Sequence, residues 1–175
     1  MDPGGVLFPA ERIAQRVAEL AADVRRDYAG RPLTIVAILQ GAAVFANDLL
    51  KHLGGEATVQ FVEASSYRDG TATDGQVALR RCGELDLAGR DVLIVDDIVD
   101  TGHTLAAVRR AVEALGPRSV RACVLLDKPS RRQVAVTIDY CGIQVPDVFV
   151  VGYGLDHAGR YRDLPHIALL GPPGA

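Results

Sequence analysis

The segment from Val92 to Leu105, with the sequence VLIVDDIVDTGHTL, holds the densest set of residue types that can do chemistry. An apolar, β-branched stretch leads into two adjacent aspartates, and the run DTGHT follows two residues later. A glycine lets the backbone approach a ligand closely, consecutive N–H groups at a helix start attract anions, and threonine hydroxyls donate further hydrogen bonds. This pattern predicts a phosphate-binding turn made by Thr101, Gly102, His103 and Thr104.

Three carboxylates accompany that turn: Asp96, Asp97 and Asp100. Acids would repel a phosphate unless ribose hydroxyls or Mg²⁺ lay between them, so the combination favours a ribose phosphate with a metal. One alternative is an acidic helix start in which Asp100 or Thr101 caps the helix and the other acids are solvated. Capping does not explain three acids emerging from an apolar strand. A second alternative, an aspartyl phosphatase turn, lacks its D-x-D arrangement.

Composition limits the classes of protein that the chain can belong to. A length of 175 residues suits one domain, and a net charge of −3 gives no basic field that could hold RNA or DNA. The N-terminus lacks the features of a signal peptide, and no apolar run approaches the ~18 residues of a membrane span. We therefore expect a cytoplasmic protein with no nucleic-acid or membrane partner.

Strand-like and helix-like segments alternate along the chain, which predicts βαβ units and a mostly parallel sheet. Ligands bind beyond the carboxyl ends of such strands, here in the loops after Leu39, Val95 and Leu126. The polar stretch from Ser65 to Gly75 is too hydrophilic for the core. The predicted strands are 33–39, 58–62, 91–95, 120–126 and 148–151, and the predicted helices are 10–28, 44–53 and 104–115.

The segment VLIVDDIVDTGHTL resembles the phosphoribosyl pyrophosphate-binding motif of type I phosphoribosyltransferases. From about Val6 to Leu170 the chain is similar to the hypoxanthine-guanine branch of that family, in the segments ILQGAAVFANDLL, VEASSYRDGTATDG, LLDKPSRR and PDVFVVGYGLDHAGRYRDLP. The resemblance implies an α/β fold with a mostly parallel twisted sheet flanked by helices and a small hood. It also implies one domain over 1–175, with a mobile lid at about 65–75 and a hood built from the N-terminal segment and about 140–170.

The resemblance assigns the purine site to residues late in the chain. Lys128 would donate to the 6-oxo group of the base; the alternative is an exposed surface lysine. Phe149 would stack on the purine ring, and core packing is the alternative. Val150 and Val151 would offer backbone groups to the purine edge.

The pyrophosphate and metal sites also follow from the resemblance. Asp156 would hold Mg²⁺ together with Asp96 and Asp97, although it could be an ordinary turn aspartate. Arg162 would contact pyrophosphate, and Arg160 is a nearby competitor for that role.

The loop that begins at Leu39, Gln40 and Gly41 would bind pyrophosphate through its amides, with a cis peptide predicted between Leu39 and Gln40. Family members often carry a basic residue at Gln40, so pyrophosphate affinity is left open. His103 also replaces a frequent lysine, and we expect little effect there. Ser66, Tyr67, Gly70 and Gly75 resemble the lid that excludes water; a plain surface loop is the alternative.

The implied activity is transfer of the 5-phosphoribosyl group from phosphoribosyl pyrophosphate to N9 of hypoxanthine or guanine, giving IMP or GMP and pyrophosphate with Mg²⁺ as cofactor. Asp100 is the predicted general base, acting by proton transfer or electrostatically. An RNA-binding regulator on the same fold and an adenine or orotate phosphoribosyltransferase are the rivals. The preferred base and the choice between a homodimer and a homotetramer stay open.

Overall fold

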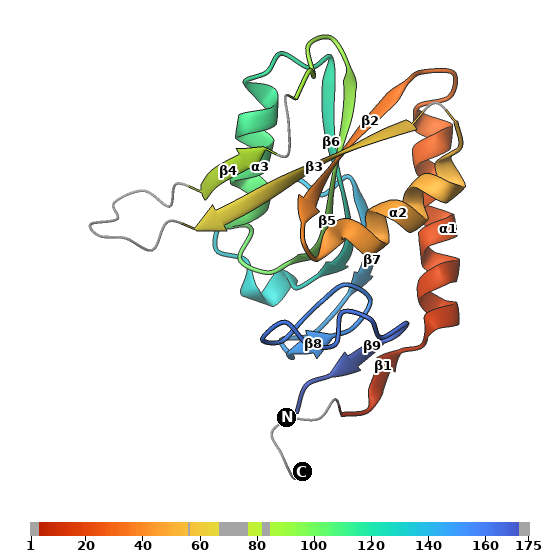
Figure 1. Ribbon diagram of the computed structural model, residues 1–175, viewed down its shortest axis with the longest axis vertical. Helices are drawn as coiled ribbons and strands as arrows, with labels where there is room; N and C mark the ends of the chain where they lie inside the picture. Colours follow the sequence, from red (N-terminus) through yellow and green to blue (C-terminus); the bar gives the residue numbers. More distant parts are fainter. Residues whose placement is uncertain (1–3, 56, 67–76, 82–84, 172–175) are drawn as a thin grey trace, which may run out of the picture.

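The structure is a computed structural model that describes residues 4–55, 57–66, 77–81 and 85–171. Within these ranges, six strands form one twisted sheet in the order β4-β3-β2-β5-β6-β7 (Figure 1). The neighbours are parallel except for the antiparallel pair β3 and β4. The strands are β2 (Leu33–Leu39), β3 (Ala57–Ser66), β4 (Val77–Arg81), β5 (Asp91–Val99), β6 (Ser119–Asp127) and β7 (Tyr140–Gln144).

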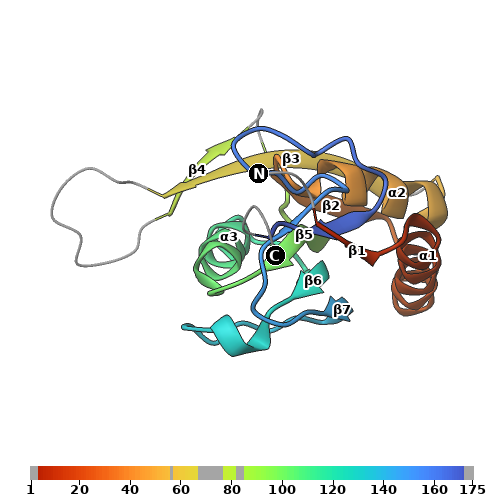
Figure 2. The ribbon, with the colours of Figure 1, turned by 90° about the horizontal axis from the view of Figure 1, so that it is seen from below.

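Helices cover both faces of this sheet, so its central strands are apolar on both sides. Helices α1 (Ala10–Asp27) and α2 (Ala42–Leu53) lie on one face, and α3 (His103–Glu113) lies on the other (Figure 2). Alternate residues of β2 enter the two cores: Ile35 joins the first and Val36 the second. Among the described residues, no helix is long and apolar enough to span a membrane.

The apolar stripe of α1 confirms the helix predicted from residue spacing. Ile13, Val17, Leu20 and Val24 are all buried, and the helix ends at Asp27 rather than residue 28. A period close to 3.6 residues places these side chains on one face, which packs against α2 and β7. The predicted bounds of β2 are confirmed without change.

A second, three-stranded sheet forms the hood beyond the carboxyl ends of the parallel strands (Figure 1). It pairs β1 (Val6–Phe8) with β9 (Ile167–Leu169), and β9 with β8 (Val150–Val151), all antiparallel. The predicted strand at 148–151 is therefore present over its last two residues as β8, but it belongs to the hood and not to the parallel sheet. The strand beside β6 is β7, where Gly142 packs against the backbone of Leu125 so closely that a Cβ would lie 2.3 Å from the Leu125 carbonyl oxygen.

Two other predicted boundaries change in ways that matter for the site. Strand β5 continues to Val99 because Asp96 and Ile98 keep pairing with β6, so Asp96 and Asp97 lie in a strand rather than in a turn. Strand β3 extends to Ser66 and pairs with β4, where we expected only a polar loop. Pairing with a neighbouring strand gives the backbone N–H and C=O groups of these polar residues hydrogen-bond partners, so β5 and β3 both extend beyond their apolar segments.

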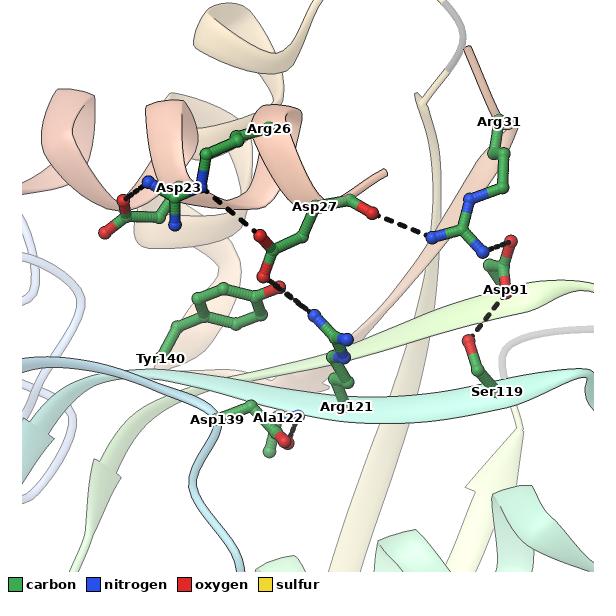
Figure 3. Close-up of polar contacts among 10 residues, drawn as sticks. All are labelled: Asp23, Arg26, Asp27, Arg31, Asp91, Ser119, Arg121, Ala122, Asp139 and Tyr140. Atoms are coloured by element: carbon green, nitrogen blue, oxygen red, sulfur yellow. Dashed lines mark hydrogen bonds and ion pairs between the residues drawn. The ribbon is translucent and has the colours of Figure 1, made fainter. Parts of the chain in front are cut away.

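At the opposite end of the sheet from the hood, Asp91 is a fully buried carboxylate within a polar network (Figure 3). Its Oδ1 accepts hydrogen bonds from Ser119 Oγ at 2.6 Å and Arg118 Nε at 3.2 Å. Arg31 Nη1 lies 3.4 Å from Oδ2. The Arg118 hydrogen bond above all, then Ser119 and the Arg31 charge, lowers the pKa of Asp91. The network ties the start of β5 to that of β6 and to the chain that follows α1.

We expect Asp91→Asn to lower the free energy of unfolding at pH 7 by about 1–3 kcal/mol, the scale of lost hydrogen bonds to a buried charge. Because the folded-state pKa is lowered, the stabilisation exists above the ordinary aspartate range and is lost as pH falls through the folded value. Urea unfolding at pH 7 and pH 3 should show the difference shrinking in acid. Asp23→Asn, at an exposed pair with Arg26, is the control and should cost less than about 1 kcal/mol.

Candidate active site

A cavity of about 360 Å³ opens between the carboxyl ends of the parallel strands and the hood. All of its lining residues except Ile98 and Leu155 were predicted as site residues from the sequence. They reach it from the loop after β2, the end of β5, the end of β6 and the hood. The lining consists of Gln40, Gly41, Asp97, Ile98, Asp100, Lys128, Phe149, Val150, Leu155, Asp156 and Arg162.

Lys128, which follows β6, is 7% exposed, so the alternative of a surface lysine is excluded. Its backbone N–H donates to Val99 O at 2.9 Å, which fixes the residue beside the end of β5. Within the described part of the chain its ammonium has no ion-pair or hydrogen-bond partner. The ammonium is not among the fully buried polar atoms without a partner, and Lys128 lines the cavity, so the three donors of this group are available to a ligand there.

Phe149, in contrast, is 52% exposed, so it is not a core residue. Its ring meets the ring of His157 edge-on, with centroids 5.4 Å apart and planes at 89°. The next residue, Val150, is buried in β8 and anchors the phenylalanine to the hood sheet. An exposed aromatic held in this way offers a stacking surface in the cavity that Lys128 also lines.

Asp96 and Asp97 are adjacent near the end of β5, and the Asp97 carboxylate lies close against Gly41 in the loop after β2. Asp96 is 6% exposed and accepts the Asp97 N–H at 3.1 Å, while Asp97 Oδ1 accepts the Ile98 N–H at 2.8 Å. Burial, followed by the charge of Asp97, raises the pKa of Asp96 well above its usual range, and burial also raises the pKa of Asp97. Solvation of these acids, part of the capping alternative, is excluded for Asp96. Hydroxyl donors or a cation would relieve the repulsion between the two carboxylates.

The predicted phosphate turn starts helix α3 without any side-chain cap. Gly102 takes the cap position with φ +90°, a left-handed backbone that favours glycine. Neither Asp100 nor Thr101 caps the helix, so the capping alternative fails here as well. The first amides of α3 have no intrahelical acceptor and can serve an anion, and His103 and Thr104 are exposed beside them.

On the hood side, Arg162 and Asp156 form an ion pair at 2.7 Å. Arg162 also donates to Gly154 O at 2.6 Å, and the Gly159 N–H donates to Asp156 at 2.7 Å. Arg162 lines the cavity and Arg160 does not. No cluster of three potential metal-ligating acids, histidines or cysteines occurs in the described ranges, so Asp156 does not gather with Asp96 and Asp97 into an all-protein metal cage.

Two arginines that were not predicted as site residues hold the Asp100 segment. Arg131 Nε donates to Asp100 Oδ1 at 3.0 Å, and Arg132 donates to the backbone oxygen of Asp100 at 2.7 Å. Arg132 also pairs with Asp127 at the end of β6. Both arginines belong to the LLDKPSRR segment, where the run of basic residues was the available signal.

The peptide bond between Leu39 and Gln40 is cis, which confirms the prediction. Gly41 and Gly154 bring the β2–α2 loop and the hood together, since a Cβ on Gly154 would lie 2.4 Å from Gly41 O. Of the predicted lid, Ser66 is the last residue of β3. Tyr67, Gly70 and Gly75 lie outside the described residues.

The carboxyl ends of the parallel strands carry the uncapped start of α3, two adjacent acids and a cavity lined by a lysine and an aromatic ring. These features together define an α/β protein of the nucleotide-binding class. The family model described as "Phosphoribosyl transferase domain" matches residues 6–158, and the chain belongs to this family. The hypoxanthine phosphoribosyltransferase of Escherichia coli K12 is 42% identical over 164 residues, which are 93% of this chain and 92% of that protein.

A second relative, the bifunctional protein TilS/HprT of Listeria innocua, is 41% identical over 167 residues. This match takes in 95% of the chain but 26% of the length of the bifunctional protein. Among solved structures, a hypoxanthine-guanine phosphoribosyltransferase from Bacillus anthracis with a HEPES molecule in its active site has a TM-score of 0.92 and 39% identity. The alignment covers 97% of this chain and 100% of that one.

Proposed function

We propose that the protein transfers the 5-phosphoribosyl group of phosphoribosyl pyrophosphate to N9 of hypoxanthine or guanine, giving IMP or GMP and pyrophosphate. The observation that carries this proposal is Lys128, a largely buried residue whose ammonium lacks a partner among the described residues and which lines one cavity with the exposed ring of Phe149. An ammonium has only donors, so it suits the 6-oxo group and opposes the 6-amino group of adenine.

The remaining site residues supply the sugar-phosphate half of the reaction. The amides from Thr101 to Thr104 would hold the 5-phosphate at the start of α3. Asp96 and Asp97 would accept hydrogen bonds from the ribose hydroxyls. The β2–α2 loop at Gln40 and Gly41 would offer amides to the departing pyrophosphate, and Arg162 would contact the same group after leaving its pair with Asp156.

Magnesium fits this site as a metal carried by the substrate. Mg²⁺ is usually held by one or two carboxylates together with substrate oxygens and water. The metal would offset the charge that develops on pyrophosphate. Asp156 on the hood side, and Asp96 with Asp97 on the ribose side, are the carboxylates that would bind it.

Turnover with hypoxanthine, guanine, xanthine and adenine, each with phosphoribosyl pyrophosphate and Mg²⁺, tests the proposal directly. We expect hypoxanthine or guanine to be used and adenine to be used at least about a hundredfold less efficiently, as for a site built around a specific hydrogen bond. Efficient use of adenine, or no transfer to any base, would overturn the assignment. Omission of Mg²⁺ should abolish turnover.

We expect Lys128→Gln to reduce kcat/KM for hypoxanthine by roughly 10- to 70-fold, because a charge-assisted hydrogen bond of about 1.5–2.5 kcal/mol to the 6-oxo group is lost. The ratio of hypoxanthine to adenine turnover should fall as well, since a glutamine amide can also accept a hydrogen bond from a 6-amino group. Steady-state kinetics with both bases measures the two effects. Lys51→Gln, at an exposed pair with Asp48, is the matched control.

The chain would act as one domain with a lid around Ser66 and Tyr67 that excludes water during transfer. The free cysteines Cys123 and Cys141 agree with a reducing compartment, and we place the protein in the cytoplasm on that basis. A homodimer or homotetramer is expected from the resemblance, and light scattering after size-exclusion chromatography would measure the number of subunits.

A further inference from the structure

The segment that follows Lys128 folds back onto the turn after β5 and fixes its backbone. The N–H groups of Gln133 and Val134 both donate to Thr101 O, at 3.0 and 3.2 Å. Arg132 adds its hydrogen bond to Asp100 O. A Cβ on Gly102 would lie 3.0 Å from Val134 O, so the two segments touch along the whole turn. The main chain of the turn is thus held without any help from Arg131.

Arg131 instead holds a side chain. It ends the short 3₁₀ turn Pro129–Arg131, the cyan turn of Figure 1, and its Nε donates to Asp100 Oδ1 at 3.0 Å. Its Nη1 lies 3.7 Å from Asp147 Oδ2, two residues before Phe149. Among the described residues, Arg131 is the sole hydrogen-bonding partner of the Asp100 carboxylate. The guanidinium therefore lies between the candidate general base and the loop that carries the candidate stacking ring.

This contact leaves the second carboxylate oxygen of Asp100 without a protein partner in the described ranges, while Asp100 lines the cavity. A half-exposed aspartate held by no other group would sample several rotamers, and only some of them would aim an oxygen at the base. A planar guanidinium that engages one oxygen restricts that freedom and leaves the other oxygen available to a substrate N–H.

We infer that Arg131 is a positioning residue that holds Asp100 by one carboxylate oxygen and so presents the other oxygen to the purine. The inference rests on the proposed function, because it concerns the step in which Asp100 meets the base. Arg131 lies outside the cavity lining, which distinguishes its role from that of Arg162. It should therefore act on the rate of the bound complex more than on binding of the activated sugar.

The test compares Arg131→Gln and Arg131→Lys with the wild-type enzyme. We expect Arg131→Gln to lower kcat about threefold to tenfold, with KM for phosphoribosyl pyrophosphate within twofold, since a misplaced catalytic group affects turnover. Arg131→Lys keeps the charge and a donor and should recover at least half of the lost kcat. Arg25→Gln, an exposed arginine on α1, removes the same charge and should leave kcat unchanged.

Non-additivity with Asp100 separates positioning from a general structural role. In an Asp100→Asn background, Arg131→Gln should lower kcat by no more than about 1.5-fold, because residues that act through one another do not add. Equal losses in both backgrounds, a kcat within twofold of wild type for Arg131→Gln, or a lysine variant no better than the glutamine variant would each overturn the inference. Thermal unfolding of each variant shows whether it is folded. Absence of transfer by the wild-type protein would instead sink the proposed function, and the inference with it.

Discussion

Asp100→Asn should lower kcat for hypoxanthine by about 100-fold or more, which is the lower part of the range for loss of a general acid–base group. The side chain lies at the cavity and is 41% exposed, with Arg131 as its partner. An amide neither takes a proton from the purine nor offers negative charge to it. The same loss would follow from a purely electrostatic role, so the substitution tests the importance of the carboxylate and not the manner of its action.

The stability of this variant should change little, because Asp100 is half exposed and the backbone of its turn is held by Arg132. Thermal unfolding within about 2 °C of wild type would correspond to less than about 1 kcal/mol for a chain of this size. Asp86→Asn removes an aspartate that is 77% exposed and pairs with Arg90, and it serves as the control for charge. A loss of kcat well under tenfold would remove Asp100 from any catalytic role.

The parts of the fold that the sequence predicts well are those governed by local burial. The run LTIVAIL is apolar at every position except Thr34 because β2 is covered on both faces, and its observed bounds equal the predicted ones. The strands that were missed depend on distant partners. Strands β1 and β9 are three residues each and exist through their pairing with one another. Strand β7 contains Gly142, whose lack of a side chain permits close approach to Leu125, a contact that no local pattern encodes.

The same distinction applies to the site. The phosphate turn is one contiguous run, so its residues and their order indicate its chemistry. The burial of Lys128 depends on how distant parts of the chain pack together. Because lysine is usually exposed, composition alone favoured a surface lysine at this position. The Arg131–Asp100 contact joins residues 31 positions apart and depends on how the chain after β6 folds back. Asp96 and Asp97 were placed in a turn because acids usually end a strand, whereas pairing with β6 carries them on.

Gly41→Ala should reduce kcat/KM for phosphoribosyl pyrophosphate by about 100-fold, the scale on which a displaced site group costs activity. A Cβ at this position would lie 1.7 Å from Asp97 Oδ2 and 2.6 Å from its Cγ. The backbone of Gly41, with φ −60° and ψ −40°, suits alanine, so the backbone itself is not strained. Asp97 must therefore rotate, which breaks its hydrogen bond from the Ile98 N–H and withdraws the carboxylate from the ribose position.

A double-mutant comparison identifies this mechanism. In an Asp97→Ala background the side chain that obstructs the new methyl group is gone, so Gly41→Ala should lower kcat/KM by less than about twofold further, because the two residues share one contact. Gly55→Ala, where no atom lies within 4 Å of the added Cβ, is the control and should retain full activity. Independent, multiplying losses from Gly41→Ala and Asp97→Ala would show that the alanine disturbs the loop amides instead. That result would mean that the close contact with Gly41 does not determine where the Asp97 carboxylate lies relative to the ribose.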